Sequence, residues 1–194
     1  MTKYFIIFTI TFLVSCQNQR KYSFSEDQKK IIRKLMTNNQ DSIYDNQHRK
    51  GKVLFAIDPE CPLCQSYSKK INQLYQLYQD SIDFYLFLPS PIFSKEKTDV
   101  FTDKYRLEIP LFVDTNQVIT SFLDAKKTPE CFLLDTNLNI RYQGLIDNWI
   151  QELGRKGQHI TEEYLDKAII AYLKNDSIII KKTNAIGCII ERFQ

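Results

Sequence analysis

The sequence has little glycine, proline and histidine: five Gly, six Pro and two His in 194 residues. It contains no internal repeat and no low-complexity tract, which argues against a fibrous or repetitive protein. Hydrophobic residues make up 43% of the chain and charged residues 25%, which is a globular composition. These proportions predict a folded domain with one good hydrophobic core.

A strong charge of one sign is also missing. The chain has 26 Lys and Arg against 23 Asp and Glu, and the formal net charge is +3. No run of basic residues is long enough to indicate a nucleic-acid partner. The two histidines, His48 and His159, are few for a metal site, because a structural zinc ion needs four ligands.

A membrane-spanning run is absent from the start of the chain, where Tyr4 to Val14 is about half the length that a spanning helix needs. With Lys3 before it, this run has the layout of a signal peptide. The residues Leu13-Val14-Ser15-Cys16 resemble a bacterial lipobox, which implies a signal peptide at 1–16 and a lipid on Cys16. An ordinary secretory signal with an incidental Cys is the alternative, and both predict export. Gln17 favours an outer-membrane destination, facing the periplasm.

The rest of the chain alternates between short apolar runs and amphipathic stretches. Residues 17–51 are expected to form a polar tether and a helix that begins at the capping box Ser25-Glu26-Asp27-Gln28. We expect strands at 53–57, 82–88, 111–113, 131–134, 140–146 and 177–180, and helices at 61–78, 94–105, 116–123 and 161–173, the last capped by Thr161. This order predicts one α/β layered domain at 52–194.

The most informative motif is Cys61-Pro62-Leu63-Cys64, at the start of an expected helix. Two thiols with this spacing can form and break a disulfide with little backbone movement. The positive end of the helix lowers the pKa of the first thiol by favouring its thiolate. The motif therefore predicts redox chemistry, with an inert disulfide or half of a metal site as alternatives.

Three segments resemble the thioredoxin-like superfamily, in particular its redoxin-type branch of exported thiol–disulfide oxidoreductases. They are residues 58–64, with the Cys pair, residues 109–114, and residues 128–135, with Thr128-Pro129. The resemblance runs from about Lys52 to the C-terminus. It implies a thioredoxin-like fold, with a central mixed sheet flanked by helices and with N-terminal and C-terminal extensions.

The resemblance also implies residue roles. Cys61 matches the exposed nucleophile that attacks a partner's disulfide, and Cys64 matches the thiol that resolves the mixed disulfide. Pro129 matches a cis-proline that faces the Cys pair. A cis bond there leaves the backbone of Thr128 open to pair with an extended substrate peptide.

The sequence departs from thioredoxins around the Cys pair. Phe55 occupies the place of their buried carboxylate, so proton transfer to Cys64 is expected to involve Glu60, Asp58 or Glu130. Glu60 directly precedes Cys61, and its negative charge should oppose formation of the thiolate. This charge favours a reductant over an oxidant.

Two further cysteines are predicted auxiliary thiols. Gly187-Cys188-Ile189-Ile190 resembles a C-terminal ending of the redoxin branch. The functional interpretation is an additional redox thiol or a Cys131–Cys188 disulfide, and the structural one is two small buried hydrophobic residues. For Cys131 we favour the buried residue, and for Cys188 both interpretations stay open.

Together these features predict a membrane-anchored thiol–disulfide oxidoreductase of the cell envelope, without a cofactor other than the Cys61/Cys64 dithiol. Its expected partners are disulfide-containing exported proteins and a membrane electron donor or acceptor. Peroxide reduction is not expected, because Asp58 stands where a peroxidase needs Thr, three residues before the attacking Cys. The alternative is a non-catalytic assembly or copper-binding lipoprotein, with His159 as a ligand.

Overall fold

A computed structural model describes Glu26, Lys29, Lys30, Ile32, residues 49–90, Ile92, and residues 94–152, 155–157 and 159–193. The expected signal peptide, Cys16 and the polar tether lie outside these residues. The helix expected from Ser25 is described at four positions, and all four are helical.

A five-stranded mixed sheet forms the centre of the molecule, with the strand order β3-β2-β1-β5-β6. Its strands are β1 (Gly51–Ala56), β2 (Ile82–Leu88), β3 (Leu111–Val113), β5 (Glu130–Asp135) and β6 (Ile140–Gly144). β1, β2 and β3 run parallel, and β5 is antiparallel to both β1 and β6. Every residue of β2 is buried, which explains why its sequence is an almost continuous apolar run.

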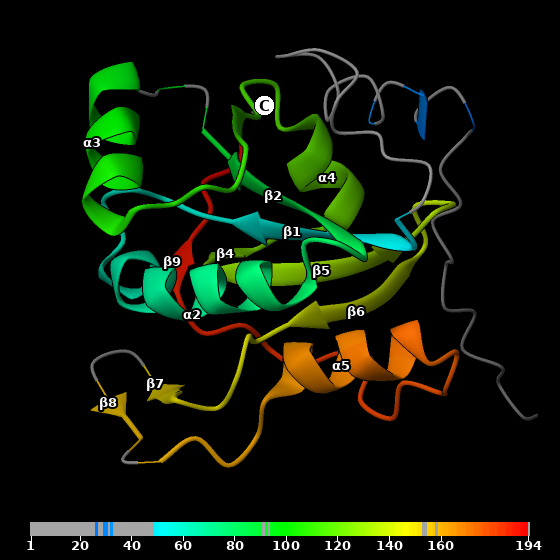
Figure 1. Cartoon of the computed structure of the whole chain (residues 1–194). Helices are drawn as coiled ribbons and strands as arrows, with labels where there is room; N and C mark the ends of the chain where they lie inside the picture. The colour runs from blue at the N-terminus through cyan, green and yellow to red at the C-terminus, as the bar shows by residue number, and fades with distance from the viewer. Residues whose placement is uncertain are drawn as a thin grey trace, which may run out of the picture.

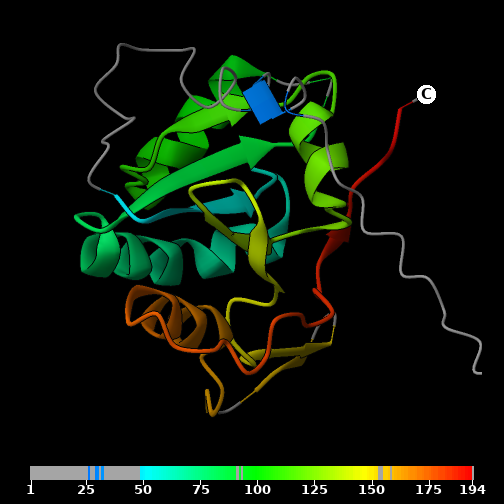
Figure 2. The ribbon, with the colours of Figure 1, turned by 90° about the vertical axis from the view of Figure 1, so that its right-hand side faces the viewer.

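Alternate residues of the central strands point into two different cores. Val53 and Phe55 belong to the core under α2 (Pro62–Tyr78), α3 (Lys95–Tyr105) and α5 (Tyr164–Leu173). Leu54 and Ala56 face the core under α4 (Val118–Leu123). Figures 1 and 2 show α2 and α5 on one face of the sheet and α4 on the other. The predicted mixed sheet flanked by helices is confirmed.

Two short antiparallel pairs lie outside the central sheet. β4 (Lys127–Thr128) pairs with β9 (Cys188–Ile189), and β7 (Ile150–Glu152) pairs with β8 (Arg155–Lys156). In Figure 1 the C-terminal segment, in red, runs alongside β4. The first pair brings the C-terminal extension to the start of α2, where the Cys motif lies.

Two sequence-based expectations are wrong. The N-cap of α5 is Glu163 rather than Thr161, since the hydroxyl of Thr161 accepts a hydrogen bond from the Asn148 side chain at 2.6 Å. Residues 177–180 form no strand. The chain pairs with β6 slightly later, where the amide of Gln143 donates to the carbonyl of Lys181 at 3.0 Å.

No helix in the described part of the chain is both long and apolar enough to cross a membrane.

Candidate active site

Cys61 is the N-cap residue of α2. Its amide donates to the carbonyl of Asp58 at 3.1 Å, and its carbonyl accepts the first helical hydrogen bond from the amide of Gln65 at 3.1 Å. The Gln65 side chain also donates to the carbonyl of Pro59 at 2.9 Å, which holds the turn before the helix. Pro62 occupies the first turn, where a backbone N–H has no partner to lose. This local structure fixes the first thiol at the positive end of a 17-residue helix.

The Thr128–Pro129 segment lies opposite this thiol. The peptide bond between the two residues is cis, as the resemblance implied. The Cys61 thiol donates to the carbonyl oxygen of Thr128, with 3.2 Å between Sγ and O. The fold thus brings together Cys61 and a dipeptide that lies far from it in the sequence.

Cys64 lies one turn inside the helix and is completely buried. Its sulfur accepts a hydrogen bond from the amide of Asp58, at 3.4 Å, and the side chain of Thr128 also hydrogen-bonds to it. Burial raises the pKa of Cys64 well above its ordinary value, and the hydrogen bond to Cys61 adds to this effect. Cys64 is therefore a thiol at neutral pH.

The pKa of Cys61 moves in the opposite direction, from its ordinary value of 9.0 to about 4. The main cause is the hydrogen bond that the Cys64 thiol donates to the Cys61 sulfur, and the Cys188 thiol donates a further one. Burial opposes the shift. The site thus contains one thiolate stabilised by two neighbouring thiols, which is the arrangement of a reactive sulfur.

The expectation of an exposed Cys61 is wrong in this structure, because only 2% of the residue is exposed. The reason is a contact between distant parts of the chain. β9 pairs with β4, which sets Cys188 directly across from Thr128 and hydrogen-bonds its thiol to Cys61.

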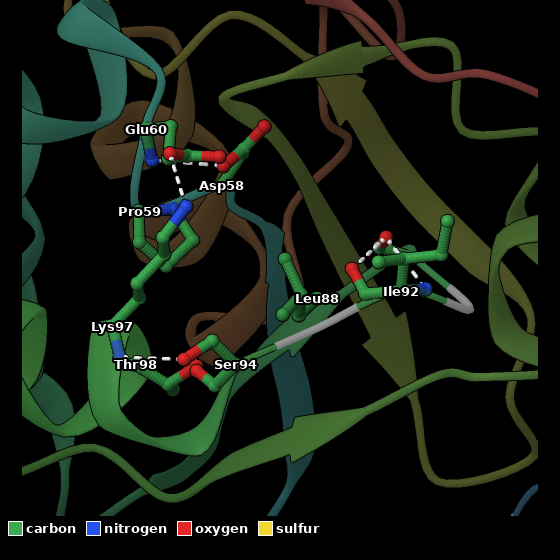
Figure 3. Close-up of a pocket in the computed structure, with 9 residues that line it drawn as sticks. Asp58, Pro59, Glu60, Leu88, Ile92, Ser94, Lys97 and Thr98 are labelled. Carbon is green, nitrogen blue, oxygen red and sulfur yellow. Dashed lines mark hydrogen bonds and ion pairs between the residues drawn. The ribbon is translucent and has the colours of Figure 1, made fainter.

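Glu60 is exposed and pairs with a lysine of α3. Its carboxylate forms an ion pair with Lys97, at 2.7 Å, beside a pocket of about 220 Å³ (Figure 3). Burial is the main cause that raises the pKa of Asp58, and the charge on Cys61 raises it further. The predicted opposition of Glu60 to the Cys61 thiolate stays a prediction, while the pKa of Cys61 is lowered overall.

Glu130 is 4% exposed and holds the backbone next to β4. Its Oε2 atom accepts hydrogen bonds from the amides of Lys126, at 2.8 Å, and Lys127, at 3.3 Å. The carboxylate thus supports the loop that carries Thr128. A role for Glu130 in proton transfer to Cys64 stays a prediction.

Cys131 is completely buried in β5 and donates to the carbonyl of Gly144 at 3.3 Å. Burial raises its pKa well above the ordinary value, which makes it unreactive. These observations agree with the interpretation of Cys131 as a small core residue. All four of Cys61, Cys64, Cys131 and Cys188 are free thiols, and Cys188 contacts Cys61 rather than forming the proposed Cys131–Cys188 disulfide.

Sequence reasoning missed Asp147 as a functional candidate. Asp147 is 1% exposed, and its Oδ1 atom accepts hydrogen bonds from the Tyr67 hydroxyl, at 2.7 Å, and the Trp149 amide, at 2.9 Å. Its Oδ2 atom is buried and receives no hydrogen bond from the described residues. Tyr67, one turn after Cys64 on the inner face of α2, thus binds a buried carboxylate. The core under α2 contains this carboxylate although Phe55 of β1 occupies the position where thioredoxins carry theirs. The acidic residue in the Gly144-Leu145-Ile146-Asp147 segment was the available signal.

A metal centre finds no support in the described ranges, where no three His, Cys, Asp or Glu side chains could together hold an ion. His159, the copper ligand in the binding-protein alternative, is exposed.

The sheet, the Cys pair at the start of α2 and the cis-proline define a thioredoxin-like domain. Residues 25–143 match the AhpC/TSA family, and the chain belongs to this family. No curated protein sequence matches it significantly.

Solved structures with the same fold include an uncharacterized conserved protein from Geobacillus kaustophilus, with 22% identity and a TM-score of 0.68 over 78% of this chain and 82% of that one. A hypothetical protein from Sinorhizobium meliloti shares 20% identity, with a TM-score of 0.65 over 76% and 82% of the two chains. A putative thiol:disulfide interchange protein, DsbE, from Chlorobium tepidum shares 16% identity, with a TM-score of 0.52 over 66% and 82%. At these identities the similarity establishes the fold alone.

Proposed function

We propose that this protein is a lipid-anchored thiol–disulfide oxidoreductase of the cell envelope, which exchanges disulfides with exported proteins through Cys61 and Cys64. Membership of the AhpC/TSA family and the thioredoxin-like fold support oxidoreductase chemistry in general. The observation that carries the proposal is the arrangement of the two sulfurs: Cys61 lies at the positive end of α2, 3.2 Å from the Thr128 carbonyl next to the cis-proline, and Cys64 is completely buried one turn further along the helix.

In the reducing direction, the Cys61 thiolate attacks one sulfur of a partner's disulfide. A bond forms between Cys61 and that sulfur, and the other partner sulfur leaves as a thiolate and takes up a proton. Cys64 then loses its proton and attacks the Cys61 sulfur. The mixed disulfide breaks, a Cys61–Cys64 disulfide remains, and the partner has gained two electrons and two protons.

The environment of Cys64 suits this order of events. Burial and the negative charge of Cys61 both hold the pKa of Cys64 high. Once Cys61 is bonded to a partner, that negative charge is gone, and Cys64 ionises more easily. Asp58, whose amide donates to the Cys64 sulfur, carries a carboxyl group beside this proton.

The direction of electron flow follows from the reduction potential. The prediction of a reductant rested on Glu60, whose carboxylate is paired with Lys97. The lowered pKa of Cys61 argues for an oxidant instead, because a stabilised thiolate favours the reduced form of the pair.

The location and partners are proposed from the sequence. The lipobox at Cys16 supports a lipid anchor in the envelope, with the outer membrane favoured and the domain facing the periplasm. Disulfide-containing exported proteins are the proposed substrates. A membrane electron donor or acceptor would regenerate the Cys pair.

A redox titration of the full-length chain in glutathione buffers tests the proposal, with mass spectrometry to identify the oxidised thiols. We expect one two-electron couple in which Cys61 and Cys64 become linked. If Cys61 and Cys64 never form a disulfide, or keep it in every glutathione buffer, the result would contradict a catalytic role of the pair. Copper that stays bound to the same sample through purification would favour the binding-protein alternative.

A further inference from the structure

The edge of β4 beside the Cys pair is occupied by the protein's own C-terminal segment. In the antiparallel pairing of β4 with β9, Thr128 lies across from Cys188 and Lys127 across from Ile189. The amide of Ile190 continues the contact by donating to the carbonyl of Lys126 at 3.0 Å. An extended substrate peptide would need this same edge to reach Cys61.

Gly187 allows the segment to approach closely. A Cβ atom at this position would lie 2.1 Å from the carbonyl oxygen of Thr128 and 2.7 Å from its carbonyl carbon. Both contacts are with backbone, which cannot rotate away. Any larger residue at this position would therefore push β9 from β4.

The C-terminal segment is held at further points beyond β9. Ile190 is 7% exposed and belongs to the core under α4. The side chain of Gln117 donates to the carbonyl of Glu191 at 2.6 Å, and Arg192 donates to the carbonyl of Ala125 at 2.7 Å. These hydrogen bonds hold the segment after β9 against the rest of the domain.

The two residues of β9 have different surroundings. Ile189 is 79% exposed, whereas the Cys188 thiol hydrogen-bonds to Cys61. Burial, with the adjacent Cys61 charge, raises the pKa of Cys188 to about 12. Cys188 is thus the third thiol of the site, held as a donor to the Cys61 thiolate.

We propose that β9 is an internal substrate strand and that Cys188 is a third redox thiol, which exchanges with Cys61. The inference rests on the proposed function. In the oxidised protein the Cys188 thiol loses its proton and its sulfur attacks Cys61. The Cys61–Cys188 bond forms, the Cys61–Cys64 bond breaks, and Cys64 leaves and takes up a proton. No electrons are gained or lost, and the reverse step restores the original disulfide.

This exchange has a consequence for substrate access. A Cys61–Cys188 disulfide locks the C-terminal segment across the β4 edge. In the reduced protein the segment is held by hydrogen bonds and packing, so β9 must leave β4 before a partner can pair there. Exported proteins would therefore compete with the protein's own C-terminus for Cys61.

The direct test uses the full-length Cys64→Ser variant, in which Cys61 and Cys188 are the two thiols of the site. After incubation with glutathione disulfide, non-reducing peptide mass spectrometry should find Cys61 linked to Cys188. Cys61 bound only to glutathione, with Cys188 free, would overturn the proposal. Adding Ile189→Ser should leave the link unchanged, whereas adding Cys188→Ser should leave Cys61 as a stable glutathione adduct.

A second test leaves all the thiols in place. Gly187→Ala should release β9 and raise the rate at which iodoacetamide modifies Cys61 by about tenfold, an effect large enough to separate from ordinary mutational scatter. Ile189→Ala is the matched control and should leave the rate unchanged. Equal rates in wild type and Gly187→Ala would show that β9 does not restrict Cys61.

The two proposals fail in different ways. If wild type forms the Cys61–Cys64 disulfide and reduces insulin, but Cys64→Ser forms no Cys61–Cys188 link, the role of Cys188 is wrong and the proposed function stands. If wild type neither links Cys61 to Cys64 nor reduces insulin, the proposed function fails, whatever Cys188 does.

Discussion

The Cys61 sulfur lies 3.2 Å from the carbonyl oxygen of Thr128, and as a thiol it donates a hydrogen bond to that oxygen. A thiolate cannot donate, so ionisation of Cys61 ends this bond and leaves the sulfur dependent on the thiols of Cys64 and Cys188. The carbonyl of Thr128 then becomes available to another donor, such as the amide of an extended peptide that takes the place of β9. Ionisation of Cys61 thus frees the Thr128 carbonyl oxygen as a hydrogen-bond acceptor for a peptide.

Replacement of Cys61 tests the nucleophile. Cys61→Ser should abolish the reduction of insulin disulfides by the full-length chain, because a hydroxyl is not ionised at neutral pH and forms no mixed disulfide. The measurement is the rate of insulin precipitation with a chemical reductant supplied. Activity retained at the level of the Ile189→Ser control would exclude Cys61 from this role.

The pH dependence of Cys61 follows from its lowered pKa. A thiol is reactive above its pKa, so alkylation of Cys61 in the reduced protein should be fully developed at neutral pH and decline as the pH falls toward about 4. The rate of modification by iodoacetamide, followed by mass spectrometry of the Cys61 peptide, measures this profile. A midpoint near 9.0, the ordinary value, would contradict the hydrogen-bond arrangement around the sulfur.

The carboxyl groups beside the site should differ in their effects. Asp58→Asn should lower the pKa of Cys61 further, because it removes a charge that interacts with the thiolate while keeping an oxygen for the Glu60 amide. Glu60→Gln should change the pKa little, since this side chain is exposed and paired with Lys97. The thiolate absorbance of the reduced variants, titrated with acid, makes the comparison. A larger effect of Glu60→Gln than of Asp58→Asn would show that Glu60 opposes the Cys61 thiolate, as its position next to Cys61 suggests.

Replacement of Cys64 should convert transient mixed disulfides into stable ones. Cys64→Ser lacks the thiol that releases the partner, so partner proteins should remain bound to Cys61 and separate only under reducing conditions. Non-reducing electrophoresis of an envelope fraction measures the yield, with Cys61→Ser/Cys64→Ser as the control. The yield should increase when Cys188 is also replaced by Ser. Adducts of equal amount in the Cys61→Ser control would show that another thiol forms them.

Replacement of Cys16 tests the lipid anchor. Cys16→Ala removes the residue expected to carry the lipid, so the protein should move from the membrane fraction to the soluble fraction. Immunoblots of the two fractions measure this change, and Cys131→Ala serves as a control for loss of a cysteine elsewhere. A Cys16→Ala protein that stays with the membrane would show that another part of the chain holds it there.

The central sheet could be predicted because short apolar runs in the sequence indicate its strands. Residues 82–88 form an apolar run, and β2 has those bounds. β4 and β9 have two residues each, too few for any periodicity, and they form only because distant segments meet. The prediction that Thr161 caps the last helix was wrong for a similar reason. Asn148, from another part of the chain, donates a hydrogen bond to the Thr161 hydroxyl.

The motif residues of the site were predictable, whereas their environment was not. The spacing of Cys61 and Cys64 and the dipeptide Thr128-Pro129 carry their chemistry in the sequence. Cys61 contacts Cys188 of β9, and the ion pair of Glu60 depends on a lysine in α3. Such contacts set the charge and exposure of a thiol, and a linear sequence does not record them.

The side-chain amide of Gln117 donates to the carbonyl of Pro89, at 3.2 Å, as well as to that of Glu191. Gln117 is 5% exposed, so departure of the C-terminal segment would leave part of a buried amide without a partner. Such a loss costs about 1–3 kcal/mol unless an incoming chain supplies a carbonyl at the same point. The Gln117 amide therefore favours binding of an extended peptide, whose carbonyl can accept this hydrogen bond. A small thiol has no carbonyl at this point and does not recover the lost bond.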